Sequence, residues 1–244
     1  MGSTDGFNDE RPVHEQCFDQ PFWIDVTVPK DAAPGEYSGV VTISMKDQRP
    51  ATVPVTLIVW DFALPDTPSL RTNFGGLGRR LLTGHPGFKP DTVPYRALER
   101  RYAEAMAAHR LCPPVPVYLR PRIGPDGTID PKETHAGLKE WIETFRLTGL
   151  PIVLLRDDDD PAGKHRAGNV KFLQSTWAYL KQHGWEKLAY VPMHDEPNDQ
   201  KGYDETRRRA KLVHEAAPGL KVFCTEQPAP QDASWGTLVG SVDI

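Results

Sequence analysis

Residues 188–197 read LAYVPMHDEP, an apolar run that ends abruptly in two adjacent acids, Asp195 and Glu196. In proteins whose strands alternate with helices, the carboxyl ends of the strands carry the catalytic groups. Pro197 follows at once; it ends the strand and disfavours a helical conformation for Glu196. The stretch therefore predicts a strand followed by a tight loop that holds two catalytic carboxyl groups.

The chain around this stretch alternates between short apolar runs and amphipathic helical patterns. Six short strands are predicted after a proline-rich linker, at residues 71–74, 115–119, 152–155, 188–193, 221–225 and 238–244. Helical periodicity separates most of them, and this alternation is typical of a parallel sheet in an α/β protein. We expect a (β/α)8 TIM-type barrel that is incomplete in this chain, because a full barrel takes about 250 residues and six strands cannot close it. The chain is then a fragment, cut at both ends, of a longer enzyme, and the alternative is an open six-stranded α/β sheet.

The first part of the chain has a different pattern. Residues 1–20 are polar without a periodic pattern, and we expect them to be a loose lead-in. Residues 21–64 alternate apolar and polar side chains in three runs, at 22–28, 37–45 and 51–60, as half-buried strands do. They predict an antiparallel β meander, the end of a β-sandwich, which precedes the partial barrel domain at residues 65–244.

Capping signals mark the starts of two predicted helices. Asp91 or Thr92 precedes a helix that has Pro94 in its first turn. Asp130 precedes a proline and is followed three residues later by Glu133, which is close to a capping box. We expect helices to begin at both places.

Composition excludes several classes of function. The net charge is −4 and the isoelectric point is near 6.1, which argues against a nucleic-acid-binding protein. No apolar run approaches the length of a membrane span. The three cysteines, Cys17, Cys112 and Cys224, are too widely spaced for a metal motif or a disulfide framework.

No cofactor or metal is predicted. The glycine-rich residues 75–78 lack the downstream acid of a dinucleotide-binding motif. The acidic run at residues 157–160 lacks the spacing of a calcium loop and is expected to be solvated. His194 and His214 lie on different elements and make a poor zinc pair.

Four short motifs resemble a known family when they are taken in order. They are WIDVTVP at 23–29, APGEYSG at 33–39, FALP at 62–65 and DEP at 195–197. Together they resemble the DUF4091 or glycoside hydrolase family 123-like group, whose characterised members are β-N-acetylgalactosaminidases with an N-terminal β-sandwich and a catalytic barrel. The resemblance covers most of the chain from residue 23 onward and suggests a secreted or periplasmic protein.

The resemblance implies a function and a role for each acid. The chain would hydrolyse terminal β-linked N-acetylhexosamine, with N-acetylgalactosamine favoured, and would retain the anomeric configuration by using the sugar's own acetamido oxygen as nucleophile. Asp195 would orient the acetamido N–H, and Glu196 would act as general acid and then general base. The family's acetamido-binding tyrosine has no counterpart here, and His194 stands where many relatives carry an apolar or aromatic residue.

Other polar side chains at predicted strand ends are candidates for binding the carbohydrate. They are Asn73, Tyr118, Arg156, His194 and Glu226. Glu226 offers an alternative scheme, in which Glu196 and Glu226 form the carboxylate pair of a double-displacement glycosidase. A further alternative is a non-catalytic carbohydrate-binding or scaffold protein. Carboxyl groups in an open cleft would favour catalysis, and burial against arginines would favour the non-catalytic protein.

Overall fold

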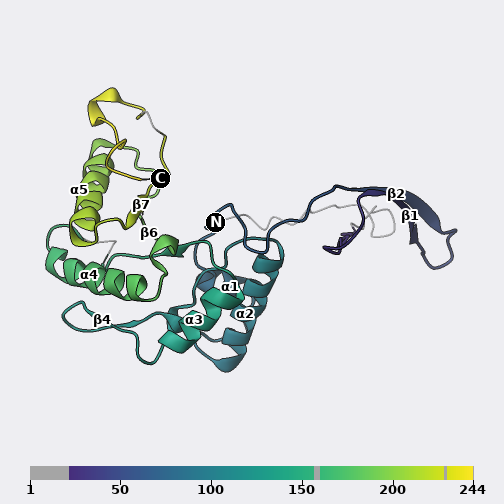
Figure 1. The fold of residues 1–244 in the computed structure, drawn as a ribbon, viewed down its shortest axis with the longest axis horizontal. Coiled ribbons are helices and arrows are strands. Elements are labelled where there is room, and N and C mark those ends of the chain that lie inside the picture. Colours follow the sequence, from purple (N-terminus) through teal and green to yellow (C-terminus); the bar gives the residue numbers. More distant parts are fainter. Residues whose placement is uncertain (1–21, 157–159, 228–229, 244) are drawn as a thin grey trace, which may run out of the picture. The chain divides into compact units, whose positions relative to one another are not determined.

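The computed structural model describes residues 22–156, 160–227 and 230–243. The chain divides into two compact units, one ending at Leu64 and the other running from Pro65 to Ile244. Figure 1 shows the course of the chain. Each unit is described by itself.

The first unit contains one antiparallel hairpin, β1 (Gly35–Ile43) and β2 (Ala51–Val59). The strands pair in register from Gly35 opposite Val59 to Ile43 opposite Ala51. Both strands were predicted, but the third strand of the expected meander is absent from the described part of this unit: residues 22–28 are exposed and pair with none of its described residues. Alternation alone does not make a strand, because the backbone also needs a hydrogen-bonding neighbour and the apolar face needs a surface to cover.

The second unit is built on a three-stranded parallel sheet, which confirms the α/β class. Its strands are β5 (Leu150–Pro151), β6 (Ala189–Pro192) and β7 (Lys221–Phe223), in the order β5-β6-β7. Two further backbone bonds extend the pairing beyond the strands, from the Ile152 N–H to the Tyr190 carbonyl at 2.8 Å and from the Met193 N–H to the Phe223 carbonyl at 2.8 Å. The carboxyl ends of β6 and β7 therefore lie side by side.

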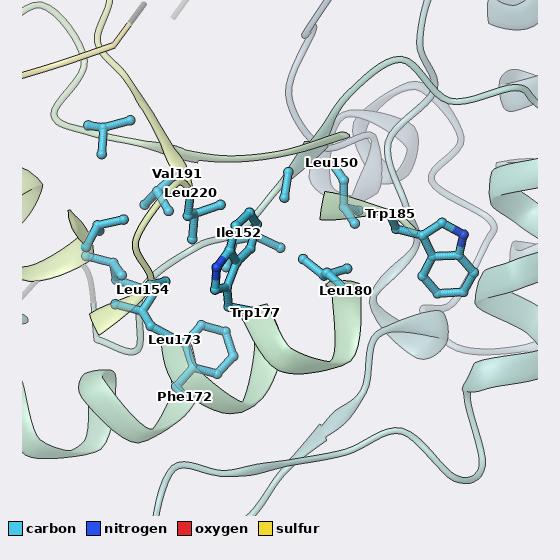
Figure 2. Close-up of a cluster of buried hydrophobic side chains, with 14 of the residues drawn as sticks. Leu150, Ile152, Leu154, Phe172, Leu173, Trp177, Leu180, Trp185, Val191 and Leu220 are labelled. Atoms are coloured by element: carbon cyan, nitrogen blue, oxygen red, sulfur yellow. The ribbon is translucent and has the colours of Figure 1, made fainter. Parts of the chain in front are cut away.

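Two long helices connect these strands, α4 (Arg166–Gln182) and α5 (Gln200–Ala216). They contact each other (Figure 1), so both cover the same face of the sheet, as two successive right-handed crossovers require. Figure 2 shows Leu173, Trp177 and Leu180 of α4 packed among the apolar side chains that follow β5 and those of β6. Val191 and its neighbour Val222 are fully buried on this face. Burial of each such side chain stabilises the fold by roughly 1.5–3 kcal/mol.

The remaining elements lie before β5. They are α1 (Gly78–Gly84), α2 (Val93–Ala108), η2 (Val117–Leu119), the short strands β3 (Arg122–Ile123) and β4 (Ile129–Asp130), and α3 (His135–Thr144). Helix α2 begins as predicted, because Thr92 Oγ1 accepts a hydrogen bond from the Tyr95 N–H. The capping box at Asp130 was wrong: Asp130 accepts from the Lys132 N–H in a local turn, and α3 starts five residues later.

The prediction of six parallel strands was wrong, and so was the alternative of an open six-stranded sheet. Within the described ranges the parallel sheet has three strands, and no closed barrel is present. Residues 71–74 are not a strand; the side chain of Thr72, rather than its backbone, accepts from the Cys112 N–H at 2.8 Å. The two helices that flank β6, by contrast, lie close to where the sequence predicted them.

The other two missing strands have local causes. Residues 115–119 contain Pro116, which cannot donate to a ladder, and the chain turns into the 3-10 helix η2 directly after it. At residues 238–243 the extended path is interrupted by Gly240, which has a positive φ of 85°. Asp243 alone bonds to β7 from the described part of this segment: its backbone N–H donates to the Val222 carbonyl at 2.9 Å, and its carboxylate accepts from the Val222 N–H at 2.8 Å and from Lys221 Nζ at 3.2 Å.

Of the helices in the described part of the chain, none combines the length and the apolar character that crossing a bilayer would require.

Candidate active site

The loop after β6 places the two adjacent acids at the carboxyl edge of the sheet. Asp195 and Glu196 are both exposed, and Pro197 behind them is buried. Glu196 has a φ of 49°, in the left-handed region. A non-glycine residue in that region costs about 1–2 kcal/mol, and such strain is concentrated at functional sites. The predicted tight loop is confirmed, and its strain is centred on the second acid.

A threonine from the neighbouring strand ties the two acids together. The Thr225 hydroxyl donates a hydrogen bond to Asp195 Oδ1 at 2.5 Å and accepts one from the Glu196 backbone N–H at 3.2 Å. Thr225 lies two residues beyond β7, so the parallel pairing of β6 and β7 brings it to the loop. One hydroxyl thus fixes the carboxylate of the first acid and the backbone of the second.

The two acids line different cavities that share Thr225 as a wall. The Asp195 pocket has a volume of about 560 Å³ and is lined by residues 71–75, Arg80, Gly149, the end of β6 and β7, Asp195 and Thr225. The Glu196 pocket has a volume of about 410 Å³ and is lined by Glu196, Asn198, Thr225, Glu226, Gln227 and Gln231. The left-handed backbone of Glu196 departs from the extended path of β6, and the two neighbouring carboxyl groups line separate cavities.

The sheet face opposite α4 and α5 forms part of the Asp195 pocket. Tyr190, Pro192 and Phe223 line it, and the rings of Tyr190 and Phe223 meet edge to face with centroids 5.9 Å apart. Burial, followed by the influence of Cys112, raises the pKa of Tyr190 to about 12. The phenol therefore stays neutral near pH 7 and is available as a hydrogen-bond donor.

Burial also keeps the Cys224 thiol, at the same edge of the sheet, protonated at neutral pH. Cys224 is 8% exposed, and its Sγ lies 3.4 Å from the His194 carbonyl. Burial first, and then the charges of Glu226 and Asp195, raise the pKa of Cys224 to about 11. A thiolate is the nucleophilic form of cysteine, so Cys224 does not supply a nucleophile at neutral pH.

Two of the five predicted binding residues lie in these pockets. Asn73 lines the Asp195 pocket; its Oδ1 accepts from the Gly75 N–H at 2.9 Å, which leaves its amide N–H groups for a ligand. Glu226 lines the Glu196 pocket, and its Oε1 accepts from the Gln227 N–H at 2.7 Å. The structure therefore brings Asn73, Glu226 and the acid pair together.

The other three predicted binding residues lie elsewhere. Tyr118 lines a separate cavity of about 220 Å³ and packs under the Arg96 guanidinium at 4.3 Å. Arg156 follows β5 with a positive φ of 52°, and it lines neither the Asp195 pocket nor the Glu196 pocket. His194 is exposed and also lines neither of them. Their binding roles stay predictions.

The surroundings of the acid pair are open. No ion pair among the described residues involves the carboxylate of Asp195 or of Glu196. Of the two arrangements weighed from the sequence, the open cleft is therefore the one observed. In the same described part of the chain, no three His, Cys, Asp or Glu side chains gather as a metal site would need.

Sequence reasoning missed four residues at this site: Thr225, Tyr190, Arg71 and Arg80. Thr225 and Tyr190 fall in runs that were predicted as strands, 221–225 and 188–193, but the sequence did not show that these runs lie side by side. Arg80 carried no signal, since it lies on α1, a helix that was not predicted.

Comparison with known protein families and with curated protein sequences finds no match to this chain. The resemblance to the glycoside hydrolase group therefore stays a prediction.

Proposed function

We propose that the chain carries the acid pair of a glycoside hydrolase that releases terminal β-linked N-acetylhexosamine, with N-acetylgalactosamine favoured. The observation that supports this most directly is the geometry around Thr225. One carboxylate is held by a hydroxyl in a large open pocket, and the next residue presents its carboxylate to an adjoining pocket. Carbohydrate is the partner that this arrangement fits.

The two acids would divide the reaction between them. Asp195, fixed through Oδ1 by Thr225, would accept a hydrogen bond from the acetamido N–H and orient the acetamido oxygen toward the anomeric carbon. As that oxygen forms its bond to the anomeric carbon, the bond to the leaving oxygen breaks, and Glu196 protonates the leaving oxygen. Water then opens the oxazolinium ion and gives its proton to Glu196, so the configuration is retained.

We also propose a barrel as the finer architecture of the second unit. Two facts support it: β5, β6 and β7 follow one another in sequence order, and α4 and α5 cover one face only. In a doubly wound sheet the strand order reverses and helices cover both faces. In a barrel the strands follow one another in sequence order and all the helices lie on the outer face. Tyr190, Pro192 and Phe223 would then face the barrel interior. The hairpin of the first unit would be part of the β-sandwich.

A second candidate mechanism rests on Glu226. It lines the same pocket as Glu196, and double displacement needs two carboxyl groups that face one cavity. A 2-deoxy-2-fluoro glycoside would label Glu226 covalently under that mechanism. Under the favoured mechanism an oxazoline mimic would inhibit, and glycosides without a 2-acetamido group would not be cleaved.

The test is hydrolysis of aryl β-N-acetylgalactosaminide and aryl β-N-acetylglucosaminide by the whole chain and its variants. Glu196→Gln is expected to lower kcat/KM by at least about a hundredfold, since general acid–base groups contribute 10²–10⁴-fold. Asp195→Asn is expected to lower it by a similar factor, since misplacing the attacking group can cost about 10²-fold. Glu143→Gln is a matched control on the exposed face of α3, where the ion pair of the side chain with a described residue is a 3.8 Å contact with Lys139. Unchanged activity in both acid variants would exclude the proposal, and ligand binding without any hydrolysis would favour the non-catalytic carbohydrate-binding alternative.

A further inference from the structure

The Asp195 pocket contains more positive than negative charge. Two arginines, Arg71 and Arg80, line it, and Asp195 is the only acid among its described lining residues. The pocket of a glycosidase that binds only a neutral sugar needs hydroxyl- and amide-binding groups, which Asn73, Tyr190 and Asp195 already supply. Two additional guanidinium groups therefore require a separate explanation.

Arg80 is held at the wall of the pocket by the backbone. Its Nη1 donates to the Phe74 carbonyl at 2.9 Å. Gly75 has a positive φ of 70°, and a Cβ there would come within 3.3 Å of the same Nη1. One N–H of the guanidinium is thus used for positioning, and the group has four further N–H donors.

Arg71 reaches the same pocket from the chain segment before Asn73. It is exposed and makes no hydrogen bond or ion pair with a described residue. Neither arginine lies within ion-pair distance of a carboxylate in the part of the chain that the structure describes. Both guanidinium groups therefore line a cavity of about 560 Å³ without an anionic partner from that part of the chain.

We propose that Arg71 and Arg80 form a subsite for an anionic substituent of the glycan, so that the substrate class is an acidic N-acetylhexosamine-containing glycan. The inference rests on the proposed function for the sugar itself. A guanidinium group presents parallel N–H donors that match a carboxylate or a sulfate ester in a bidentate manner. Asp195 remains the acceptor for a neutral N–H of the same ligand.

The charges disfavour the other simple occupants. A cationic ligand would be repelled by two guanidinium groups at close range. A neutral oligosaccharide would leave both without a counter-charge. The volume lies within the range of about 300–1,000 Å³ that is usual for ligand pockets, so a sugar together with a charged group or a second sugar can be accommodated.

The experiment measures binding to the whole chain carrying Glu196→Gln, so that hydrolysis does not interfere. Three probes are compared by calorimetry: methyl β-N-acetylgalactosaminide, the same glycoside with a sulfate ester on its primary hydroxyl, and N-acetylgalactosamine β-linked to glucuronic acid. We expect at least one anionic probe to bind at least about tenfold more tightly than the neutral one, since a hydrogen bond to a charged group contributes this much or more. The preference should weaken as the salt concentration rises.

Arginine variants locate the effect. The double variant Arg71→Gln and Arg80→Gln is expected to abolish the preference while neutral-probe affinity stays within about twofold, and each single variant should lose part of it. Arg101→Gln, an exposed arginine on α2 outside the pocket, is the matched control and should keep the preference. Urea unfolding of all variants checks that stability is unchanged.

The outcomes separate the inference from the proposed function. Equal binding of all probes, binding of none, or a preference that survives in the double variant would overturn the anionic subsite. Displacement of the probes by inorganic sulfate, with no added affinity from the sugar, would reduce it to a plain anion site and overturn the glycan assignment. If the preference depends on the arginines but aryl glycosides are not hydrolysed, the subsite stands and the catalytic proposal fails.

Discussion

The Thr225 hydroxyl donates a hydrogen bond of 2.5 Å to Asp195 Oδ1, across the boundary between the ends of β7 and β6. The same oxygen accepts the backbone N–H of Glu196 at 3.2 Å. Because a hydroxyl can donate one proton and accept in addition, this single side chain sets both the rotamer of the first acid and the backbone of the second.

Thr225→Val removes both hydrogen bonds and keeps the shape of the side chain. We expect exchange of the Glu196 amide proton with solvent to accelerate roughly five- to tenfold, since a hydrogen bond contributes about 1 kcal/mol. Proton exchange measured by NMR checks this, and it needs no enzyme activity. Thr225→Ser retains the hydroxyl and should behave as the wild type; equal exchange rates in the Val and Ser variants would contradict the role assigned to Thr225.

The first turn of α5 packs against Pro197, the residue that follows the acid pair. Asp199 Oδ1 accepts the Gly202 N–H at 2.6 Å, and a Cβ on Gly202 would come within 3.0 Å of the Pro197 side chain. Asp199→Ala is expected to lower the free energy of unfolding by about 1 kcal/mol, the usual effect of losing an N-cap. Urea unfolding measures it.

The cap of α2 offers a comparison for that result. Thr92 Oγ1 accepts from the Tyr95 N–H at 3.4 Å, a longer and weaker contact, and its exposed hydroxyl donates to the Lys89 carbonyl at 2.8 Å, a bond that water can replace when the hydroxyl is removed. Thr92→Ala should therefore cost less than Asp199→Ala, and Asp199→Ser should recover most of the loss. An equal loss of unfolding free energy in Thr92→Ala and Asp199→Ala would show that the shorter hydrogen bond at Asp199 gives no additional stability.

The acid loop was predictable because its signals are local. An apolar run, two acids and a proline dictate a strand end and a turn within a few residues, and the structure has both. The residues that complete the site depend on packing over long sequence separations: Thr225 follows β7, and Arg80 lies on a short helix, α1, that the sequence did not predict. Sequence patterns report which face of an element is apolar, but not which elements meet.

The strand predictions failed where local composition and pairing disagreed. Residues 115–119 are apolar enough for a strand, yet Pro116 removes a donor and η2 forms instead. Residues 22–28 alternate as a strand should but have no paired neighbour in the described part of the first unit. A strand is a property of two chain segments, and a period-two pattern describes only one of them.

The buried thiol at the site should make the fold sensitive to alkali. Burial, and then the charges of Glu226 and Asp195, raise the pKa of Cys224 from 9.0 to about 11. The folded state therefore favours the protonated thiol, and its contribution to stability is complete below pH 9 and is lost as the pH rises through about 11. The linked loss is at most roughly 2–3 kcal/mol, since one pKa unit corresponds to 1.36 kcal/mol.

Urea unfolding at several pH values tests this linkage. The difference in unfolding free energy between wild type and Cys224→Ala should shrink as the pH rises from 9 toward 11. Tyr179 and Tyr190, whose pKa values are raised to about 12, titrate in both proteins and cancel in the difference. A difference that is independent of pH over this interval would show that the thiol is not linked to folding.

The left-handed backbone at Glu196 makes an unusual prediction about glycine. At most positions a glycine is less stable than an alanine, because it loses more backbone freedom on folding. Glu196 has a φ of 49°, where alanine keeps the steric cost and glycine removes it. Glu196→Gly should therefore exceed Glu196→Ala in unfolding free energy by about 1 kcal/mol, whereas Glu143→Gly on α3 should fall below Glu143→Ala by a similar amount. The same sign at both positions would disprove strain at Glu196. If glycine is more stable than alanine at position 196 but less stable at position 143, the chain keeps a strained glutamate where glycine would fit better. Such a conflict between stability and function is expected where the carboxylate itself is needed.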